Sequence, residues 1–122
     1  MAYDEYLADR VRQQFAERKA NVSEKKMMGG LIFMVNEKMC IGVDVDRTTK
    51  IDRLMVRVGP DYYEEALEQK GVKNMDFTGR PMKGFVFVSP EGFDTDKELS
   101  HWVDRAMAYN PFAKKSKKRS KK

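Results

Sequence analysis

His101 and Cys40 carry the two side chains of this sequence most suited to catalysis, and each residue type occurs once. Nucleophilic catalysis needs a nucleophile, a base and an orienting group in one place. On a helix expected near the end of the chain, His101 lies about 200° from Leu99, which places it on the polar face as a solvated surface residue. Cys40 falls in a strand pattern with no assignable cation or helix N-terminus beside it, so we expect an inert, partly buried thiol. The sequence predicts no catalytic residue and no enzyme.

The remaining candidate ligands do not favour a metal site. One histidine and one cysteine cannot furnish the four ligands of a zinc site. Asp44, Asp46 and Asp52 superficially resemble a calcium-binding loop. However, Thr49 stands where such a loop requires glycine, and Met55 stands where it requires a bidentate glutamate. We therefore expect a solvated loop, with no metal and no cofactor.

A glycine pair and an acidic cluster also have structural explanations. Gly29 and Gly30 precede an expected strand, so they offer no helix N-terminus to a phosphate, and we expect a bend or close backbone packing there. Glu64, Glu65 and Glu68 share one face of a short expected helix, where acidic residues near the start are favourable. We therefore expect the glycine pair and the glutamate cluster to have structural roles and no catalytic or phosphate-binding role.

The elements that must position these residues begin with a β-hairpin after the glycine pair. Apolar residues alternate from Leu31 to Val35 and again from Met39 to Val45, which is the period of a strand. The turn lies at Asn36, Glu37 and Lys38. Turn-forming residues are also expected at 78–81. The expected strands are 31–35, 39–45, 53–58, 75–77 and 84–88.

Three helices are expected around these strands. The first covers 3–15, where an apolar residue recurs every four positions. The second is short, with Asp61 as its N-cap and Gly71 beyond its end. The third begins at Thr95 and Glu98, which have capping-box spacing. The order is α-β-β-β-α-β-β-α, and the short strand connections favour antiparallel pairing, so we predict an α+β fold with a five-stranded antiparallel sheet.

Both faces of this sheet are expected to be apolar, and a sheet that is apolar on both sides must be covered twice. One face takes Leu31, Phe33, Val35, Leu54 and Val56. The other takes Ile32, Met34, Cys40, Met55 and either Val86 or Phe87. In one interpretation the three helices divide between the faces. In the other, a second subunit covers Ile32, Met34 and Met55, because methionine suits adaptable interfaces.

The charge of the chain is concentrated at its C-terminal end. The formal net charge is +5, and the segment after Phe112 holds seven basic residues and no acid. Removing these seven from the 24 lysines and arginines leaves 17 against 19 acidic residues, so residues 1–112 carry about −2. We expect a folded domain over 1–112 and a disordered basic tail over 113–122. Candidate nucleic-acid contacts are Lys114, Lys115, Lys117, Lys118, Arg119, Lys121 and Lys122.

Such a tail would contact phosphates without reading sequence. Solubility or contact with acidic partners are the alternative explanations for it. The lone Cys40 fits a reducing compartment, and the start of the chain has no apolar segment typical of a signal peptide. No run approaches the roughly 18 apolar residues of a membrane span. We therefore expect a soluble cytoplasmic protein without a membrane partner.

A basic, methionine and double-glycine entry into the hairpin is the most specific motif of the chain. It consists of Lys25, Lys26, Met27, Met28, Gly29 and Gly30. With the apolar spacing that follows, residues 3–109 resemble the amino-terminal domain of the TfoX/Sxy competence-regulator family, in a stand-alone form that lacks the carboxy-terminal domain. The family usually has phenylalanine at the position of Met28 and a glycine in the turn occupied by Glu37 and Lys38.

The resemblance implies an α+β domain with a five-stranded antiparallel sheet, similar to secretion chaperones and often a homodimer. It favours a non-enzymatic regulatory domain that acts through protein contacts, with a protein partner or a second copy of the chain, in transcription or competence. Two alternatives stay open, a nucleic-acid-binding accessory protein that uses the basic tail and an enzyme acting on a small molecule. Exposed basic residues on the folded body would favour the nucleic-acid-binding protein. A deep pocket lined by acidic residues with shifted pKa values would favour the enzyme.

Overall fold

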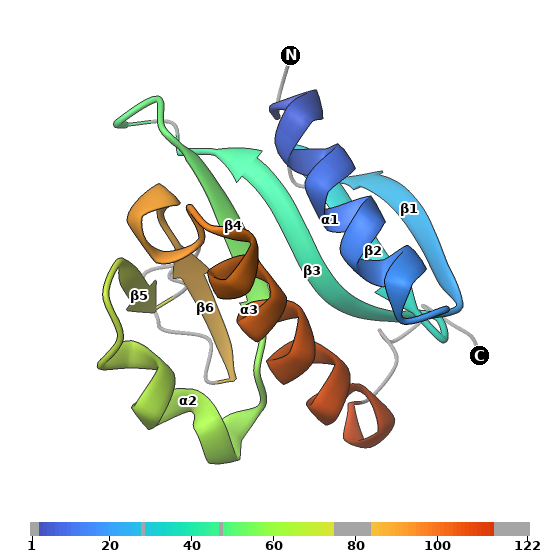
Figure 1. Ribbon diagram of the computed structural model, residues 1–122. Coiled ribbons are helices and arrows are strands. Elements are labelled where there is room, and N and C mark those ends of the chain that lie inside the picture. The colour runs from blue at the N-terminus through green and yellow to red at the C-terminus, as the bar shows by residue number, and fades with distance from the viewer. Residues whose placement is uncertain (1–2, 28, 47, 75–83, 114–122) are drawn as a thin grey trace, which may run out of the picture.

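The computed structural model describes residues 3–27, 29–46, 48–74 and 84–113. These residues form a six-stranded antiparallel sheet in the order β1-β2-β3-β4-β6-β5, with three α-helices on one side of it (Figure 1). The elements are α1 (Glu5–Glu17), β1 (Val22–Met27), β2 (Gly30–Val35), β3 (Lys38–Val45), β4 (Asp52–Arg57), α2 (Pro60–Leu67), β5 (Val72–Asn74), β6 (Phe85–Val88), η1 (Pro90–Gly92), α3 (Asp96–Tyr109) and η2 (Asn110–Phe112). The predicted α+β class is confirmed.

The predicted count of five strands was wrong, because β1 was interpreted as a basic lead-in. This strand pairs with β2 from Val22, opposite Val35, to Met27, opposite Gly30. It is an edge strand, and its residues 23–26 are exposed and polar or charged, so it has no apolar alternation by which to recognise it. At the other end of the sheet, β5 covers Val72–Asn74, while the predicted strand 75–77 and turn 78–81 lie outside the described residues.

The predicted start of α3 is confirmed, whereas α1 begins at Glu5 and not at residue 3. Asp4 caps α1, and its side chain accepts a hydrogen bond from the Tyr6 amide. Thr95 and Glu98 form the complete capping box of α3. The start of α2 differs from the prediction, because Gly59 and not Asp61 is its N-cap. Gly59 has a φ of 87°, which only glycine adopts without strain, and Pro60 follows at the first helical position.

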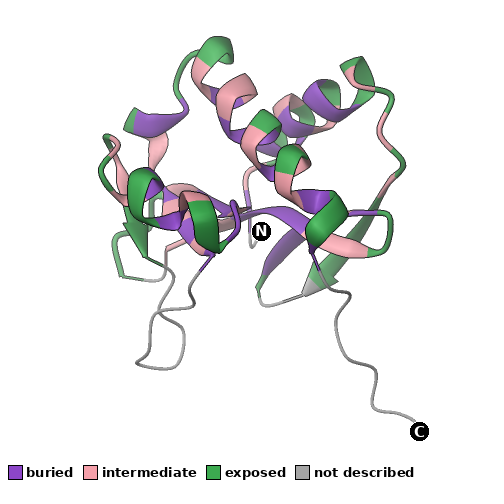
Figure 2. Cartoon of the chain, turned by 90° about the horizontal axis from the view of Figure 1, so that it is seen from below, coloured by how far each residue is buried: buried purple, intermediate pink, exposed green. Residues whose placement is uncertain are grey.

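The hydrophobic core lies between the sheet and the helices. Helix α1 covers the β1–β2 side, α3 crosses the middle and α2 lies at the β6–β5 end (Figure 1). The largest fully buried side chains include Trp102, Phe15 and Phe33, and the rings of Phe15 and Phe33 lie 5.8 Å apart. Seen from below, all three helices lie above the sheet and turn their buried residues toward it (Figure 2). Within the described ranges, every helix is too short or too polar to traverse a bilayer.

The β2–β3 hairpin has two departures from regular geometry. Its two-residue turn places both Asn36 and Glu37 at positive φ, 53° and 68°, the arrangement that matches strand twist. A register shift follows, since Phe33 pairs with Ile41 but Met34 pairs with Met39. Cys40 is therefore the extra residue of a β-bulge.

Asn110 joins the end of α3 to this hairpin. Its side chain is buried, and its Nδ2 atom donates a hydrogen bond to the Val35 carbonyl at 3.1 Å. Its Oδ1 atom accepts a hydrogen bond of 3.3 Å from the side-chain Nδ2 atom of Asn36. The Lys38 ammonium donates to the Asn110 carbonyl at 3.0 Å. Ala113, at the end of the described chain, is also buried.

Candidate interaction surface

The side of the sheet opposite the helices carries a second, smaller apolar cluster. Its buried centre is Ile32 and Met55, and partly buried side chains surround it. We call this surface the methionine face, defined by Ile32, Met34, Met39, Met55, Phe85 and Phe87. No helix residue among those described contributes to it. The interpretation in which the helices divide between the two faces was therefore wrong.

The structure decides the alternative between Val86 and Phe87 that was left open for the methionine face, and it differs from the prediction at Cys40. Phe87 lies on this face, whereas Val86 is buried in the main core beneath the helices. Cys40 also lies in the main core and not on this face. The bulge explains the position of Cys40, because it turns two successive residues of β3, Cys40 and Ile41, toward the helices.

Gly42 lies at the centre of the methionine face and lets its two buried side chains approach the backbone. A Cβ atom at this position would come within 2.7 Å of Ile32 Cδ1 and 3.5 Å of Met55 Cε. Gly42 pairs with Ile32 on one neighbouring strand and with Met55 on the other, so all three residues share this side of the sheet. The flexible methionines and the ring of Phe87 lie around them.

Arginines from β4 lie over the phenylalanines of β6. The Arg53 guanidinium lies 3.6 Å from the centre of the Phe87 ring. It also makes two hydrogen bonds to Asp44, at 2.8 and 3.2 Å, and one to Asp46 at 3.3 Å. The pKa of the Asp46 carboxyl is lowered, chiefly by hydrogen bonds from the Thr48 and Thr49 amides and further by the charge of Arg53. The charge of Arg53 is thus balanced.

Arg57, two residues further along β4, has no such balance. Its guanidinium lies 5.1 Å from the Phe85 ring centre and 5.9 Å from that of Tyr109, and it donates to the Met39 carbonyl at 3.4 Å. No acidic residue in the described ranges pairs with it. Lys25, opposite Ile32, and Lys73, opposite Phe87, place two more cations on the same side of the sheet, and both are exposed.

The three candidate calcium ligands do not converge. Asp44 and Asp46 bind Arg53, whereas Asp52 precedes Arg53 on β4 and alternates to the opposite side of the sheet. Burial raises the pKa of the Asp52 carboxyl, and the negative charge of Asp4 raises it further. No group of three candidate ligands occurs among the described residues. A hollow of about 470 Å³ at this end of the sheet has a mixed lining that includes Asp46, Ile51, Lys73 and Glu91.

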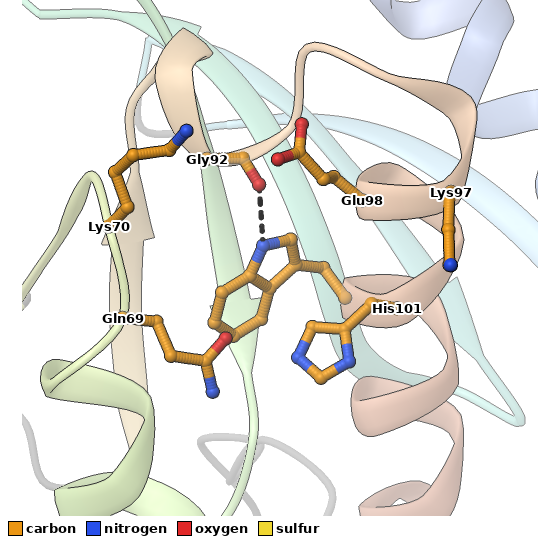
Figure 3. A pocket seen from close by; sticks show the side chains of 7 residues that line it. Gln69, Lys70, Gly92, Lys97, Glu98 and His101 are labelled. Atoms are coloured by element: carbon orange, nitrogen blue, oxygen red, sulfur yellow. Dashed lines mark hydrogen bonds between the residues drawn. The ribbon is translucent and has the colours of Figure 1, made fainter.

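His101 and Trp102 line a cavity of about 350 Å³. Figure 3 shows the imidazole of His101 extending from α3 at this cavity. Its Nε2 atom is 3.4 Å from the Tyr62 hydroxyl, and its ring meets the Trp102 indole edge-on at 4.8 Å. It is half-buried, so the prediction of a solvated histidine was wrong. Tyr62 extends from α2 toward α3, and the Gln69 amide donates to the same hydroxyl at 2.5 Å.

Two polar groups of this cavity serve structural roles. The Trp102 indole N–H donates to the Gly92 carbonyl at 2.9 Å, and this bond is drawn in Figure 3. The Glu98 carboxylate accepts from the Thr95 amide at 3.1 Å, and that bond is the main reason why its pKa is lowered. The cavity lining contains no serine, threonine or cysteine. Among the described residues it therefore offers no hydroxyl or thiol nucleophile.

The other sequence candidates are placed as follows. Cys40 is buried, and burial raises the pKa of its thiol to about 12. Lys25 and Lys26 lie on β1, Gly29 has a φ of 76°, and a Cβ atom at Gly30 would lie 2.3 Å from the Val43 carbonyl oxygen. The glycine pair thus provides the bend and the close packing that were predicted. Met28 and the seven basic residues of the tail lie outside the described residues.

Comparisons with known proteins agree with this architecture. The model of the TfoX N-terminal domain family matches residues 13–109. A crystal structure of a protein from Pseudomonas syringae is similar in fold, with a TM-score of 0.56 and 15% sequence identity, over 78% of this chain and 94% of that one. No curated protein matches the chain. Because the family model covers well over half of the sequence, this chain belongs to the TfoX N-terminal domain family.

Proposed function

We propose that this chain is a non-enzymatic regulatory domain that acts in the cytoplasm through protein contacts made by the methionine face. Membership of the TfoX N-terminal domain family supports a competence-related role. The thiol of Cys40 is buried and protonated, and the cavity beside Trp102 is lined without serine, threonine or cysteine, so neither favours catalysis by a hydroxyl or thiol nucleophile. Regulation by contact requires only a surface that a partner can cover.

One observation carries this proposal, the second apolar cluster on the side of the sheet away from the helices. The helices bury one face of the sheet, and among the described residues none of them contributes to the methionine face. Methionine side chains adapt to different partners, and apolar surface removed from water contributes about 25 cal/mol per Å² to association before its costs. The face is suited to a protein contact.

Gene replacement tests this function in the organism. RNA abundance is compared among strains that carry the wild-type gene, a deletion, Met34→Glu and Tyr6→Glu. Met34 belongs to the methionine face, whereas Tyr6 is 71% exposed on α1, so the second substitution adds the same charge away from that face. Met34→Glu should reproduce the transcript changes of the deletion, and Tyr6→Glu should resemble the wild type. A deletion that changes no transcript, or a functional Met34→Glu protein, would contradict the proposal.

Nucleic-acid binding is the second candidate, and the charge of the chain favours it. Seven basic residues follow Ala113 without any acid, and such a segment contacts phosphates independently of base sequence. In this function the tail would attach the domain to DNA or RNA, and the folded body would contribute little affinity.

A further inference from the structure

We infer that the methionine face binds an acidic segment of another protein, which places apolar side chains at its centre and carboxylates over the cations at its edges. This inference rests on the proposed function and names the chemistry of the partner. It follows from the arrangement of apolar and charged side chains on this side of the sheet.

The centre of the face is aliphatic and sulfur-containing. Ile32 and Met55 lie closely packed over Gly42, and Met34, Met39 and Phe85 surround them. Two of these surrounding residues, Met34 and Met39, oppose each other across β2 and β3, so they can move apart together to admit an apolar side chain. This part of the surface selects apolar groups.

The edges of the face are basic. Strand pairing places Lys25 opposite Ile32, Arg57 opposite Phe85 and Lys73 opposite Phe87, all directed to this side of the sheet. The acid that strand pairing places on the same side is Asp44, opposite Arg53, and it is bound to that arginine. In the described part of this surface Lys25, Arg57 and Lys73 therefore form no ion pair, although Lys73 lies close enough to Asp46 for its charge to lower the pKa of that carboxyl.

Arg57 is the most informative of these cations. Arg57 is half-buried, and its guanidinium lies 5.1 and 5.9 Å from the centres of two aromatic rings and donates one long hydrogen bond, of 3.4 Å, to a carbonyl. A guanidinium has five N–H donors in a planar fork that matches a carboxylate. A partner carboxylate would therefore supply hydrogen bonds and charge that the described chain does not provide.

The same charge pattern disfavours a second copy of this chain. Two copies related by a two-fold axis would place the same basic surface on both sides of the interface, and like charges there cost affinity. Nucleic acid is also a poorer match, because single strands bind by stacking bases on open aromatic rings. Here the guanidinium of Arg53 already lies over the Phe87 ring, and the centre of the face is aliphatic. An acidic protein segment satisfies both the centre and the edges.

Selection from a random peptide library tests this inference. Phage displaying random 16-residue peptides are selected on the immobilised full-length chain, after removal of phage that bind the Met34→Glu variant. Both proteins carry the basic tail, so peptides that bind only the tail are discarded. The enriched peptides should combine several Asp or Glu residues with at least two large apolar residues. The most enriched peptide is then synthesised, and its dissociation constant is measured by fluorescence anisotropy.

Substitutions at the edges give the quantitative test. Arg57→Gln should weaken the peptide by about tenfold and the exposed-site variant Lys25→Gln by about threefold, because each removes one charge pair. Lys97→Gln, at an exposed lysine on α3, removes the same charge elsewhere and should change nothing. Thermal unfolding of each variant identifies any that fails to fold. Because Lys25 is exposed, we expect Lys25→Gln to fold normally, so its binding result can be interpreted even if Arg57→Gln unfolds. Arg57→Glu should weaken the peptide further, and a peptide in which the single acid that pairs with Arg57 is replaced by lysine should regain binding to Arg57→Glu.

Several outcomes would overturn the inference. They are a selection that enriches neutral or basic peptides, no enrichment beyond the Met34→Glu background, or binding that both edge variants leave unchanged. Sedimentation that shows dimers of the wild type and monomers of Met34→Glu would identify a second copy as the occupant instead. Oligo(dT) that displaces the peptide would identify a single-stranded nucleic acid. If the peptide result fails while Met34→Glu still abolishes regulation, the partner chemistry is wrong and the proposed function stands.

Discussion

Cys40 carries a thiol that the core keeps protonated. It is 1% exposed, and burial raises the pKa of its thiol to about 12, with a small opposing effect of the Arg57 charge. At pH 8 the folded protein should therefore react with iodoacetamide far more slowly than the protein in urea. Mass spectrometry of the alkylated peptide measures both rates. Equal rates in the two states would show that the thiol is accessible.

His101 and Trp102 should differ in their effect on stability, although they are adjacent. Trp102→Ala removes a fully buried indole and should lower the free energy of unfolding by about 3 to 5 kcal/mol. His101→Ala removes a hydrogen bond to Tyr62 and an edge contact with Trp102, so we expect a loss of about 1 kcal/mol. Urea unfolding measures both values. A neutral His101→Ala variant would show that the contact with Tyr62 does not stabilise the fold.

The capping box of α3 should stabilise that helix measurably. The Thr95 hydroxyl accepts from the Glu98 amide at 3.0 Å, and the Glu98 carboxylate accepts from the Thr95 amide. Thr95→Ala leaves the Glu98 amide without its partner and should cost about 1 kcal/mol. Thr95→Ser keeps a hydroxyl and should retain most of the stability. Urea midpoints of the three proteins provide the comparison.

Glu98 should make this contribution dependent on pH. Its pKa in the folded state is lowered, chiefly by the Thr95 amide, so the folded protein favours the ionised carboxylate. The stabilisation is present above the unfolded pKa near 4.5 and is lost as the pH falls through the folded value. Glu98→Gln should therefore be less stable than the wild type at pH 7, and the difference should shrink at pH 3. A difference that is independent of pH would show that the charge of Glu98 has no role.

Most of the helices and strands could be predicted because their periodicity is local. The stripe of α1, the capping box of α3 and the alternation of the β2–β3 hairpin each depend on residues within a few positions. Strand β1 could not be recognised, since an exposed edge strand needs no apolar alternation. The bulge at Cys40 was also hidden. It shifts the alternation of β3 by one residue, and its position depends on the pairing with β2.

The candidate surface could be predicted in part, because the alternation of residues along a strand is also a local pattern. Alternation alone placed Ile32, Met34 and Met55 together, and the structure brings them onto one face. The arrangement of Arg57 against Phe85 could not be derived, because it depends on β4 pairing with β6 rather than with a strand adjacent in sequence. The half-burial of His101 was missed for a similar reason, since Tyr62 reaches it from another helix.

The basic tail and the folded body should be separable parts of the whole molecule. Truncation after Ala113 removes all seven basic residues of the tail and keeps the buried Ala113. Affinity for random-sequence duplex DNA should fall to background, while the melting temperature stays nearly unchanged, because the tail has no apolar residue to bury. Filter binding at several salt concentrations and thermal unfolding measure the two effects.

Two results would contradict this separation. Tight binding of duplex DNA by the truncated chain would place a recognition surface on the folded body. A preference of the full chain for one DNA sequence by more than about 10³ would require base contacts, which lysines that bind only phosphates do not make.

The bond from Asn110 to the Val35 carbonyl has a consequence for how the chain folds and opens. Strands β1 to β4 pair with their neighbours in sequence, so their contacts close short loops and should form early. The Asn110 side chain joins residues 75 positions apart, and its bond can form only after α3 has packed across the sheet. We expect the last turn of α3 to be released first in local opening, so its amides should exchange with deuterium sooner than those of β2 and β3.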